Sequence, residues 1–210
     1  MLYLAKYMSP LGMLTLVSDE ENLMGLWIDG QKYYGGKLKE RLESKQEVIS
    51  LVCLEADLKA DLKNEFGSEV AGELGGNFVE ISKKEMCGNG IPGILRKTKF
   101  WLDRYFAGEK PDMDELSLAP QGSEFCKMVW GILCEIPYGE VTTYGEIAKK
   151  VAERTGKKSM SAQAVGGAVG HNPISIIIPC HRVIGADGSL TGYAGGIEKK
   201  VKLLELEKEL

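Results

Sequence analysis

The feature that most constrains this chain is an apolar run at residues 174–178 that stops at Pro179 and leads straight into Cys180, His181 and Arg182. The run is rich in β-branched isoleucine, which predicts a buried strand. Proline cannot donate a backbone hydrogen bond, so Pro179 should end that strand and turn the chain. The thiol is therefore expected at a strand end. A thiol, with a pKa near ~8.5, needs a base or a positive charge to react at neutral pH, and His181 and Arg182 offer both.

A Cys-His pair alone is most often a packed cysteine followed by surface residues. The flanking motifs of this chain alter that interpretation, and they come in the order Ala164-Val165-Gly166-Gly167-Ala168, Asn172-Pro173, residues 178–183 and Tyr193-Ala194-Gly195-Gly196. In this order they resemble the methylated-DNA-protein-cysteine methyltransferases, also called O6-alkylguanine-DNA alkyltransferases. The resemblance is strong over residues 120–210, weaker over 1–30 and not evident between about 35 and 95.

The resemblance implies DNA repair by a protein that acts once. Cys180 would take the alkyl group from O6 of a damaged guanine and stay alkylated, without a cofactor. The implied partner is double-stranded DNA containing O6-alkylguanine, and the protein is expected to be a monomer. Two other functions remain open: a non-catalytic module that binds alkylated DNA, whose known representatives lack this cysteine, and an unrelated cysteine hydrolase that turns over many substrates.

Glu207 is the expected third member of the reactive group. Residues 197–210 have helical spacing, and Glu207 follows Leu203 by four residues and Leu204 by three, so it shares their apolar face. A buried carboxylate needs a partner, although a solvated glutamate near the C-terminus is the alternative. In the family, a glutamate at this distance pairs with the histidine. Glu207 would then orient His181, which would draw the proton from Cys180 through a water. Lys200 shares the same face, either as a snorkelling lysine or with a role at the site.

Two further residues are expected at the catalytic site. Tyr144 opens a predicted helix at 144–154 behind a capping box of Thr143 and Glu146, and the family places a tyrosine there beside the flipped base, where its hydroxyl could supply a proton. Asn172 precedes a proline and could be a simple turn former, but in the family it braces the cysteine loop. The loop over the base pocket is expected from Tyr193, Ala194 and Gly195.

The helices predicted at 144–154 and 161–171 suggest a helix-turn-helix. The second is poor in bulky side chains, which suits either close packing inside the protein or, as in the family, entry into the minor groove with base flipping. Where the family commonly has an arginine that fills the vacated space, this chain has Gln163, which lacks the charge and the planar cation. The expected DNA contacts are Gln163, Ala164, Gly167, Lys157, Lys158 and Arg182.

Charge is unevenly spread along the chain. The whole chain has 26 Lys and Arg against 30 Asp and Glu, but residues 120–210 hold eleven against ten, so the acidity belongs to the other part. DNA affinity is expected to be modest and salt-sensitive. The sequence has no long apolar span and no export signal at residues 1–10, which favours a cytoplasmic protein with no membrane contact. No metal site is expected, because the cysteines at 53, 87, 126 and 134 show no paired ligand spacing and should pack.

The fold class expected is α/β in the α+β sense. An N-terminal domain over residues 1–110 should hold a small antiparallel sheet and helices, with an atypical middle segment at about 35–95. A C-terminal domain over residues 120–210 should be mostly helical, with the helix-turn-helix and the short buried strand that leads to the cysteine. The local patterns predict a three-stranded meander in residues 1–30, helices at 37–66 and 92–107, a linker at 108–119 and a helix capped by Ser123.

Overall fold

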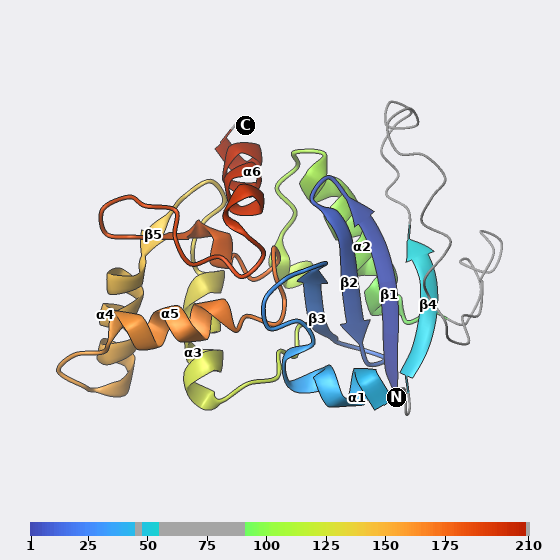
Figure 1. Cartoon of the computed structure of the whole chain (residues 1–210), viewed down its shortest axis with the longest axis horizontal. Coiled ribbons are helices and arrows are strands. Elements are labelled where there is room, and N and C mark those ends of the chain that lie inside the picture. Colours follow the sequence, from blue (N-terminus) through green and yellow to red (C-terminus); the bar gives the residue numbers. More distant parts are fainter. Residues whose placement is uncertain (45–47, 55–90, 209–210) are drawn as a thin grey trace.

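The computed structural model describes residues 1–44, 48–54 and 91–208. They form a mixed α+β fold in which a four-stranded sheet packs beside a group of helices, as the sequence predicted (Figure 1). The strands are β1 (Leu2–Ser9), β2 (Gly12–Ser18), β3 (Leu23–Ile28), β4 (Val48–Leu54), β5 (Thr142–Thr143) and β6 (Val183–Ile184). The helices are α1 (Lys39–Ser44), α2 (Gly93–Phe106), α3 (Glu124–Cys134), α4 (Tyr144–Thr155), α5 (Ala162–Gly170) and α6 (Ile197–Lys208), with 3-10 turns η1 (Gly36–Leu38), η2 (Met113–Glu115) and η3 (Cys180–Arg182).

The sheet has the order β3-β2-β1-β4. The meander of β1, β2 and β3 is antiparallel, which confirms the prediction, and β4 adds to the other edge of β1 in parallel. The helix predicted over 37–66 is wrong over residues 48–54, where the β-branched Val48 and Ile49 begin β4 and its backbone pairs with β1. Among the described residues of that segment, 37–38 belong to the 3-10 turn η1 and 39–44 form α1, while residues 45–47 and 55–66 lie outside the described part.

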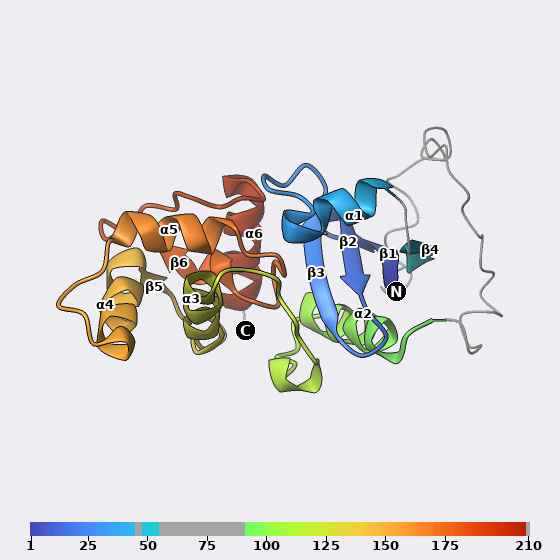
Figure 2. The same ribbon diagram turned by 90° about the horizontal axis from the view of Figure 1, so that it is seen from below.

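The two faces of the sheet are both covered. Alternate residues of β2 and β3 point to opposite sides, so that Leu16 and Leu26 join the large core while Val17 and Trp27 join a smaller cluster with Leu38. Helix α2 lies against the first face and the η1–α1 segment against the second, as Figure 2 shows from below. The large core also contains the buried side chains of α3, α4 and α5. The division into domains at 1–110 and 120–210 stays a prediction.

The free edge of β3 ties the sheet to the C-terminal half. Leu26 donates its backbone N–H to Pro173 O at 2.8 Å and its carbonyl accepts from Ser175 N at 2.8 Å. Earlier on the same strand, Leu23 pairs in the same way with Ser117 and Ala119. These contacts satisfy an edge that would otherwise be open and fix the segment that leads to Cys180.

The strand predicted at 174–178 does not form. Ile174 makes a single bridge to Leu26, after which the chain coils through turns in which Ile178 N bonds to Ile174 O at 3.0 Å. Ile176 has a φ of 72°, which is rare for a β-branched residue and marks a strained turn. All five residues are buried as predicted, but their hydrogen bonds close within the turn and to β3 instead of continuing a ladder. The apolar run thus predicted the burial of these residues correctly, but their burial did not imply a strand.

The helices of the C-terminal half form where the capping signals predicted them. Ser123 Oγ accepts from Cys126 N at the start of α3, and Thr143 and Glu146 form the predicted capping box of α4. Gly156 ends α4 with a φ of 65°, a left-handed conformation that glycine adopts without strain. Helices α4 and α5 pack against each other and against α3, as expected of the predicted helix-turn-helix.

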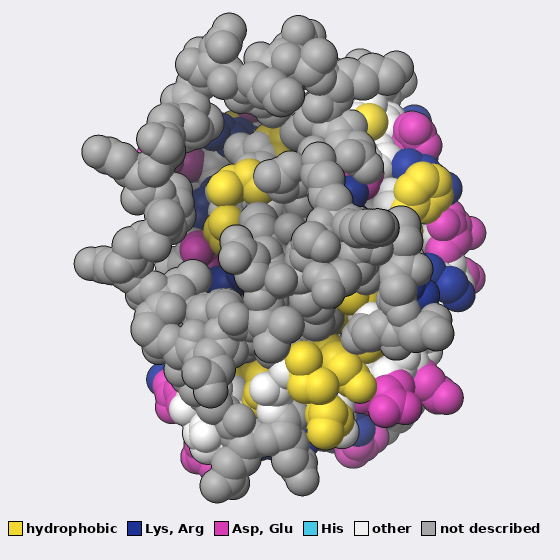
Figure 3. Space-filling view, turned by 90° about the vertical axis from the view of Figure 1, so that its right-hand side faces the viewer, with side chains coloured by type: hydrophobic (Ala, Val, Ile, Leu, Met, Phe, Trp, Pro, Cys, Tyr) yellow, Lys and Arg dark blue, Asp and Glu magenta, His cyan; other side chains and the backbone are white. Residues whose placement is uncertain are grey.

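Figure 3 shows the molecule from the β4 side. Among the described side chains visible there, both acidic and basic groups lie along the right-hand rim. In the described part of the chain, no helix has the length and apolarity needed to cross a membrane.

Candidate active site

Cys180 opens the 3-10 turn η3 directly after the coiled segment 174–178, and only 6% of its surface is exposed. Burial raises the pKa of its thiol to about 11, although hydrogen bonds and the charge of Lys200 oppose that shift. The thiol is therefore protonated at neutral pH and cannot react without a base. The sequence placed this cysteine at a strand end, and the structure places it in the first turn of a 3-10 helix.

Asn172 braces the turn that carries the thiol. Its side-chain amide donates to Ile178 O at 2.8 Å and to Cys180 Sγ at 3.1 Å, and its carbonyl oxygen accepts from Ile174 N at 3.0 Å. The side chain is 2% exposed. One buried amide thus joins both ends of the turn to the sulfur, which is the bracing geometry expected from the resemblance. The hydrogen bond from the Asn172 amide to the sulfur stabilises the thiolate once the thiolate forms.

His181 and Glu207 form a buried pair. His181 Nε2 lies 2.8 Å from Glu207 Oε1, and both side chains have no exposed surface. The Glu207 carboxylate accepts five hydrogen bonds in all, from Tyr105, His181, Gly139 and twice from Arg182. Burial by itself would raise the pKa of Glu207, but the hydrogen bonds and charges of His181 and Arg182 outweigh it and hold the pKa well below its ordinary value. Glu207 is therefore a carboxylate, and the position inferred from the helical spacing is confirmed as a buried one.

The ionised carboxylate also sets the tautomer of His181. Because Glu207 can only accept, the hydrogen of the neutral imidazole sits on Nε2, and Nδ1 keeps a free lone pair. Nδ1 is buried and has no hydrogen-bond partner among the described residues. Burial lowers the pKa of His181, and Glu207 only partly opposes that shift. The imidazole is therefore neutral at physiological pH and can accept a proton at Nδ1.

The prediction that Arg182 contacts phosphate is wrong. Its guanidinium donates to Glu207 through Nε at 2.8 Å and Nη2 at 2.9 Å, and through Nη1 to Ile136 O at 2.7 Å. The residue is 9% exposed. Because two nitrogens of the Arg182 guanidinium bind the buried Glu207 carboxylate, Arg182 neutralises that charge and is not available to DNA.

The loop that follows η3 is held from two sides. Lys200 is fully buried and donates to Val183 O and to Thr191 O, so it does not snorkel. Tyr144 donates its hydroxyl to the same Thr191 carbonyl at 3.1 Å. Burial raises the pKa of Tyr144, and the charge of Cys180 adds to the rise, so the phenol stays protonated at neutral pH. Its role stays a prediction.

The segment 193–196 lies against the N-terminal half. Ala194 O accepts from Lys32 N at 3.0 Å, and a Cβ on Gly195 would meet the Tyr193 ring at 2.8 Å and Ile28 at 3.1 Å. Only glycine therefore fits at 195 without a shift of its neighbours. The Tyr193 hydroxyl is buried and has no hydrogen-bond partner in the described part of the chain. That hydroxyl is a polar group that a bound base could satisfy.

The surface of α5 fits the expectation of a thin contact helix. Gln163, Ala164 and Gly167 are exposed on it, and a Cβ added at Gly167 would meet no atom within 4 Å. Gly167 is therefore not required by packing inside the protein, which counts against the alternative interpretation. Lys157 and Lys158 are exposed in the turn before this helix. Their contacts with DNA stay predictions.

Two residues from the N-terminal half reach the site although no motif marks them. Tyr105 on α2 donates its hydroxyl to Glu207 Oε1 at 2.7 Å across 102 positions of sequence. Gln31 accepts from Ser175 Oγ at 3.0 Å and from Ile28 N at 3.1 Å, which ties the coiled segment before the cysteine to β3. Neither residue stands in a motif, and only the packing of the two halves brings them to the site.

Of the other four cysteines, the structure describes the side chains of two, and neither of these two belongs to the site. Cys126 and Cys134 are half-buried free thiols on α3, and burial raises the pKa of Cys134 to about 11. The side chains of the cysteines at 53 and 87 lie outside the described part. Within the described ranges, no group of three His, Cys, Asp or Glu side chains could hold a metal ion.

A family model matches the part of the chain that contains Cys180, His181 and Glu207. It is described as 6-O-methylguanine DNA methyltransferase, DNA binding domain, and it matches residues 124–209. The methylated-DNA-protein-cysteine methyltransferase of Methanosarcina acetivorans is 54% identical over 114 residues, which cover 54% of this chain and 69% of that protein. The enzyme of the same name from Mycobacterium tuberculosis is 52% identical over 118 residues, 56% of this chain and 67% of that protein. The crystal structure of Mycobacterium tuberculosis OGT in complex with DNA has a TM-score of 0.67 at 34% identity, covering 99% of this chain and 93% of that one.

Proposed function

The chain belongs to the methylated-DNA-protein-cysteine methyltransferases, and we propose that Cys180 is the cysteine that accepts the alkyl group. The function is the direct repair of DNA by transfer of a methyl group from O6 of guanine to the protein, which inactivates itself. One observation carries the role of Cys180, which is the pairing of its thiol with a base. The thiol accepts a hydrogen bond from Asn172 and adjoins His181 in the sequence. The His181 imidazole is bound through Nε2 to the Glu207 carboxylate, and its Nδ1 has no partner among the described residues.

The proposed reaction is an in-line displacement. His181 Nδ1 takes the proton of Cys180, through a water, and the thiolate attacks the alkyl carbon. The S–C bond forms as the C–O6 bond breaks, and the electron pair of that bond stays on the guanine oxygen. The base must gain a proton as it leaves, and the Tyr144 hydroxyl, which otherwise donates to Thr191 O, would supply it. The proton that His181 took from Cys180 would then pass through water to replace the one that Tyr144 gave. The net change moves one proton from sulfur to guanine.

We further propose that double-stranded DNA lies along α5. The exposed small residues Ala164 and Gly167 would allow close approach to the minor groove, and Gln163 would face the space left by the extruded nucleotide. Lys157 and Lys158 would contact phosphates. The segment 193–196 would close over the flipped base, with the Tyr193 hydroxyl as a hydrogen-bond partner.

The free thiol supports action in a reducing compartment such as the cytoplasm, since Cys180 must stay reduced until it meets the lesion. We propose that one chain acts alone, because Cys180, His181 and Glu207 of a single chain already form the reactive group.

The test is a count of lesions removed. The protein is mixed with an excess of duplex containing one O6-methylguanine per molecule, and restored guanine is measured over time. We expect restored guanine to reach at most one equivalent per protein and then stop. Continued release of product would indicate a turnover enzyme such as a cysteine hydrolase, and tight binding with no restored guanine would indicate a recognition module.

Replacing Gln163 with arginine is expected to speed repair of duplex DNA by about tenfold at moderate salt, because arginine adds a planar cation where the base has left. A fluorescent base analogue opposite the lesion would report extrusion directly. Gln163→Lys is the matched control, since it adds the charge without the planar group. Equal extrusion in Gln163→Arg and the unaltered protein would defeat the assignment of this residue to the vacated space.

A further inference from the structure

Tyr105 is a buried phenol whose hydroxyl makes one hydrogen bond within the described part of the chain, and that bond reaches the reactive group. The residue is 1% exposed, and its hydroxyl donates to Glu207 Oε1 at 2.7 Å. The same oxygen accepts from His181 Nε2 at 2.8 Å. The Tyr105 hydroxyl and the imidazole therefore share one carboxylate oxygen, although they lie 76 positions apart in the sequence.

The surrounding helix holds Tyr105 in this position. The ring stacks on Trp101 at a centroid distance of 5.3 Å and meets Phe106 edge-on at 5.4 Å and Tyr138 edge-on at 6.1 Å. Trp101 is itself fixed, since its indole N–H donates to Asp112 O at 2.9 Å. A ring packed on three sides has little freedom to turn its hydroxyl away from Glu207.

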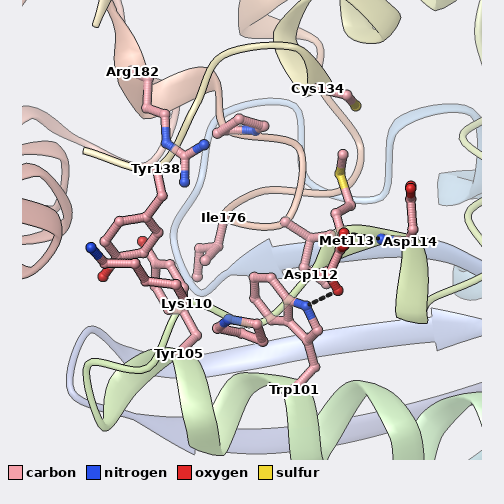
Figure 4. Close-up of a pocket in the computed structure, with 13 residues that line it drawn as sticks. Trp101, Tyr105, Lys110, Asp112, Met113, Asp114, Cys134, Tyr138, Ile176 and Arg182 are labelled. Carbon is pink, nitrogen blue, oxygen red and sulfur yellow. Dashed lines mark hydrogen bonds between the residues drawn. The ribbon is translucent and has the colours of Figure 1, made fainter. Parts of the chain in front are cut away.

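Tyr105 and Arg182 also line a cavity of about 250 Å³ behind the reactive group, on the side of α2 and η2 (Figure 4). In this view the Tyr105 and Tyr138 rings lie close together below Arg182. The Tyr105 hydroxyl is bound to Glu207, and Cys180 is not among the residues that line this cavity, so we take Tyr105 to act through Glu207.

We infer that Tyr105 is a positioning residue for the reaction, through which the N-terminal half sets the proton affinity of His181. This inference rests on the proposed function. The hydroxyl places the positive end of its dipole beside the carboxylate oxygen that faces the imidazole, so it weakens the pull of Glu207 on a proton at His181. Without the hydroxyl, the Glu207 carboxylate has one hydrogen bond fewer and attracts a proton on His181 more strongly. The imidazolium form of His181 is then favoured. The neutral base needed for transfer then persists only at higher pH.

The charged groups that act on His181 are Glu207, Arg182 and Lys200, and Cys180 adjoins it in the same turn. Tyr105 faces Glu207 and Arg182 as well, and its ring meets that of Tyr138, which does not act on the imidazole. None of the groups that act on His181 changes in the Tyr105 variant. Burial raises the pKa of Tyr105 well above its ordinary value, and the Glu207 charge adds to the rise, so the phenol remains a donor over the working range. Replacing only the hydroxyl of Tyr105 therefore isolates its own contribution.

The test is the pH dependence of the single-turnover rate. In Tyr105→Phe we expect the acid limb to move to higher pH by roughly half a unit or more, with the final yield still one methyl group per protein. Tyr138→Phe is the matched control, because it removes a hydroxyl that has no partner among the described residues from a ring beside Tyr105. Its acid limb should stay in place.

An ortho-fluorinated tyrosine at position 105 is expected to give a change of opposite sign, because it keeps the hydroxyl and replaces only one ring hydrogen. Its more acidic hydroxyl is a stronger donor, so the acid limb should move to lower pH. NMR titration gives the same answer at equilibrium, since the chain has only two histidines and His171, which stacks on Tyr33, serves as the internal reference. If the acid limbs of the unaltered protein, Tyr105→Phe and the fluorinated protein coincide, Tyr105 is a packing residue only. Absence of transfer in the unaltered protein would instead defeat the proposed function.

Discussion

Replacing Cys180 with serine is expected to abolish alkyl transfer, by about 10⁴-fold or more, while binding to the lesion duplex is retained. Serine fits the same turn and can still accept from the Asn172 amide. Its hydroxyl is far less acidic than a thiol, and a neutral histidine cannot generate the alkoxide at a useful rate. Restored guanine and duplex affinity, measured on the same samples, check both parts of the prediction.

Cys126→Ser is the matched control for Cys180→Ser. Cys126 is a half-buried free thiol on α3 with no contact to the reactive group described above. Its variant should transfer one methyl group per protein at the unaltered rate. Full transfer by the Cys180→Ser protein would show that another residue is the acceptor.

Replacing Glu207 with glutamine is expected to slow transfer by roughly 10²- to 10⁴-fold. It should also lower the free energy of unfolding by about 3–5 kcal/mol, because Arg182 would be left as a buried charge without its partner. The amide group of glutamine would face the guanidinium donors, and the remaining oxygen could not satisfy both His181 and Arg182. Single-turnover kinetics and denaturant unfolding at neutral pH measure the two effects.

The same variant should flatten the acid side of the stability curve. The pKa of Glu207 is lower in the folded state than in the unfolded chain, so its contribution is present above the unfolded value of about 4.3 and is lost as the pH falls toward the folded value. The pKa of His181 is also lowered by burial, so a further loss begins as the pH falls below about 6.5. Glu207→Gln should remove the first of these losses.

Glu205→Gln is the matched control for both effects of Glu207→Gln. Glu205 lies two positions earlier on α6, but its side chain is exposed. Its variant should keep the rate of transfer and the stability within a few tenths of a kcal/mol of the unaltered protein. An equal effect of the two substitutions would mean that the buried position of Glu207 has no special importance.

Much of the fold could be predicted, because its signals are local. Alternating apolar residues marked the three strands of the meander, and the caps at Ser123 and Thr143 marked where α3 and α4 begin. The errors arose where burial came from tertiary packing. Residues 174–178 are buried on all sides but coil through a strained turn, and residues 48–54 form a strand because β1 offers an open edge.

The candidate site could be predicted only in part for the same reason. Helical spacing placed Glu207 on the buried face of α6, and the structure pairs it with His181. Arg182 was misassigned, because adjacency in sequence could not reveal that its fork turns inward to the same carboxylate. Tyr105 could not be found at all, since it carries no motif and reaches the site from α2 across the junction of the two halves.

The most direct test of the central claim is the site of the methyl group after reaction. The protein is incubated with a duplex that carries one O6-methylguanine, digested, and its cysteine peptides are compared by mass with those of the unreacted protein. We expect one added methyl group, carried by the peptide that contains Cys180 and by no other cysteine peptide. Restored guanine with an unmodified Cys180, or a methyl group on a different cysteine, would contradict it.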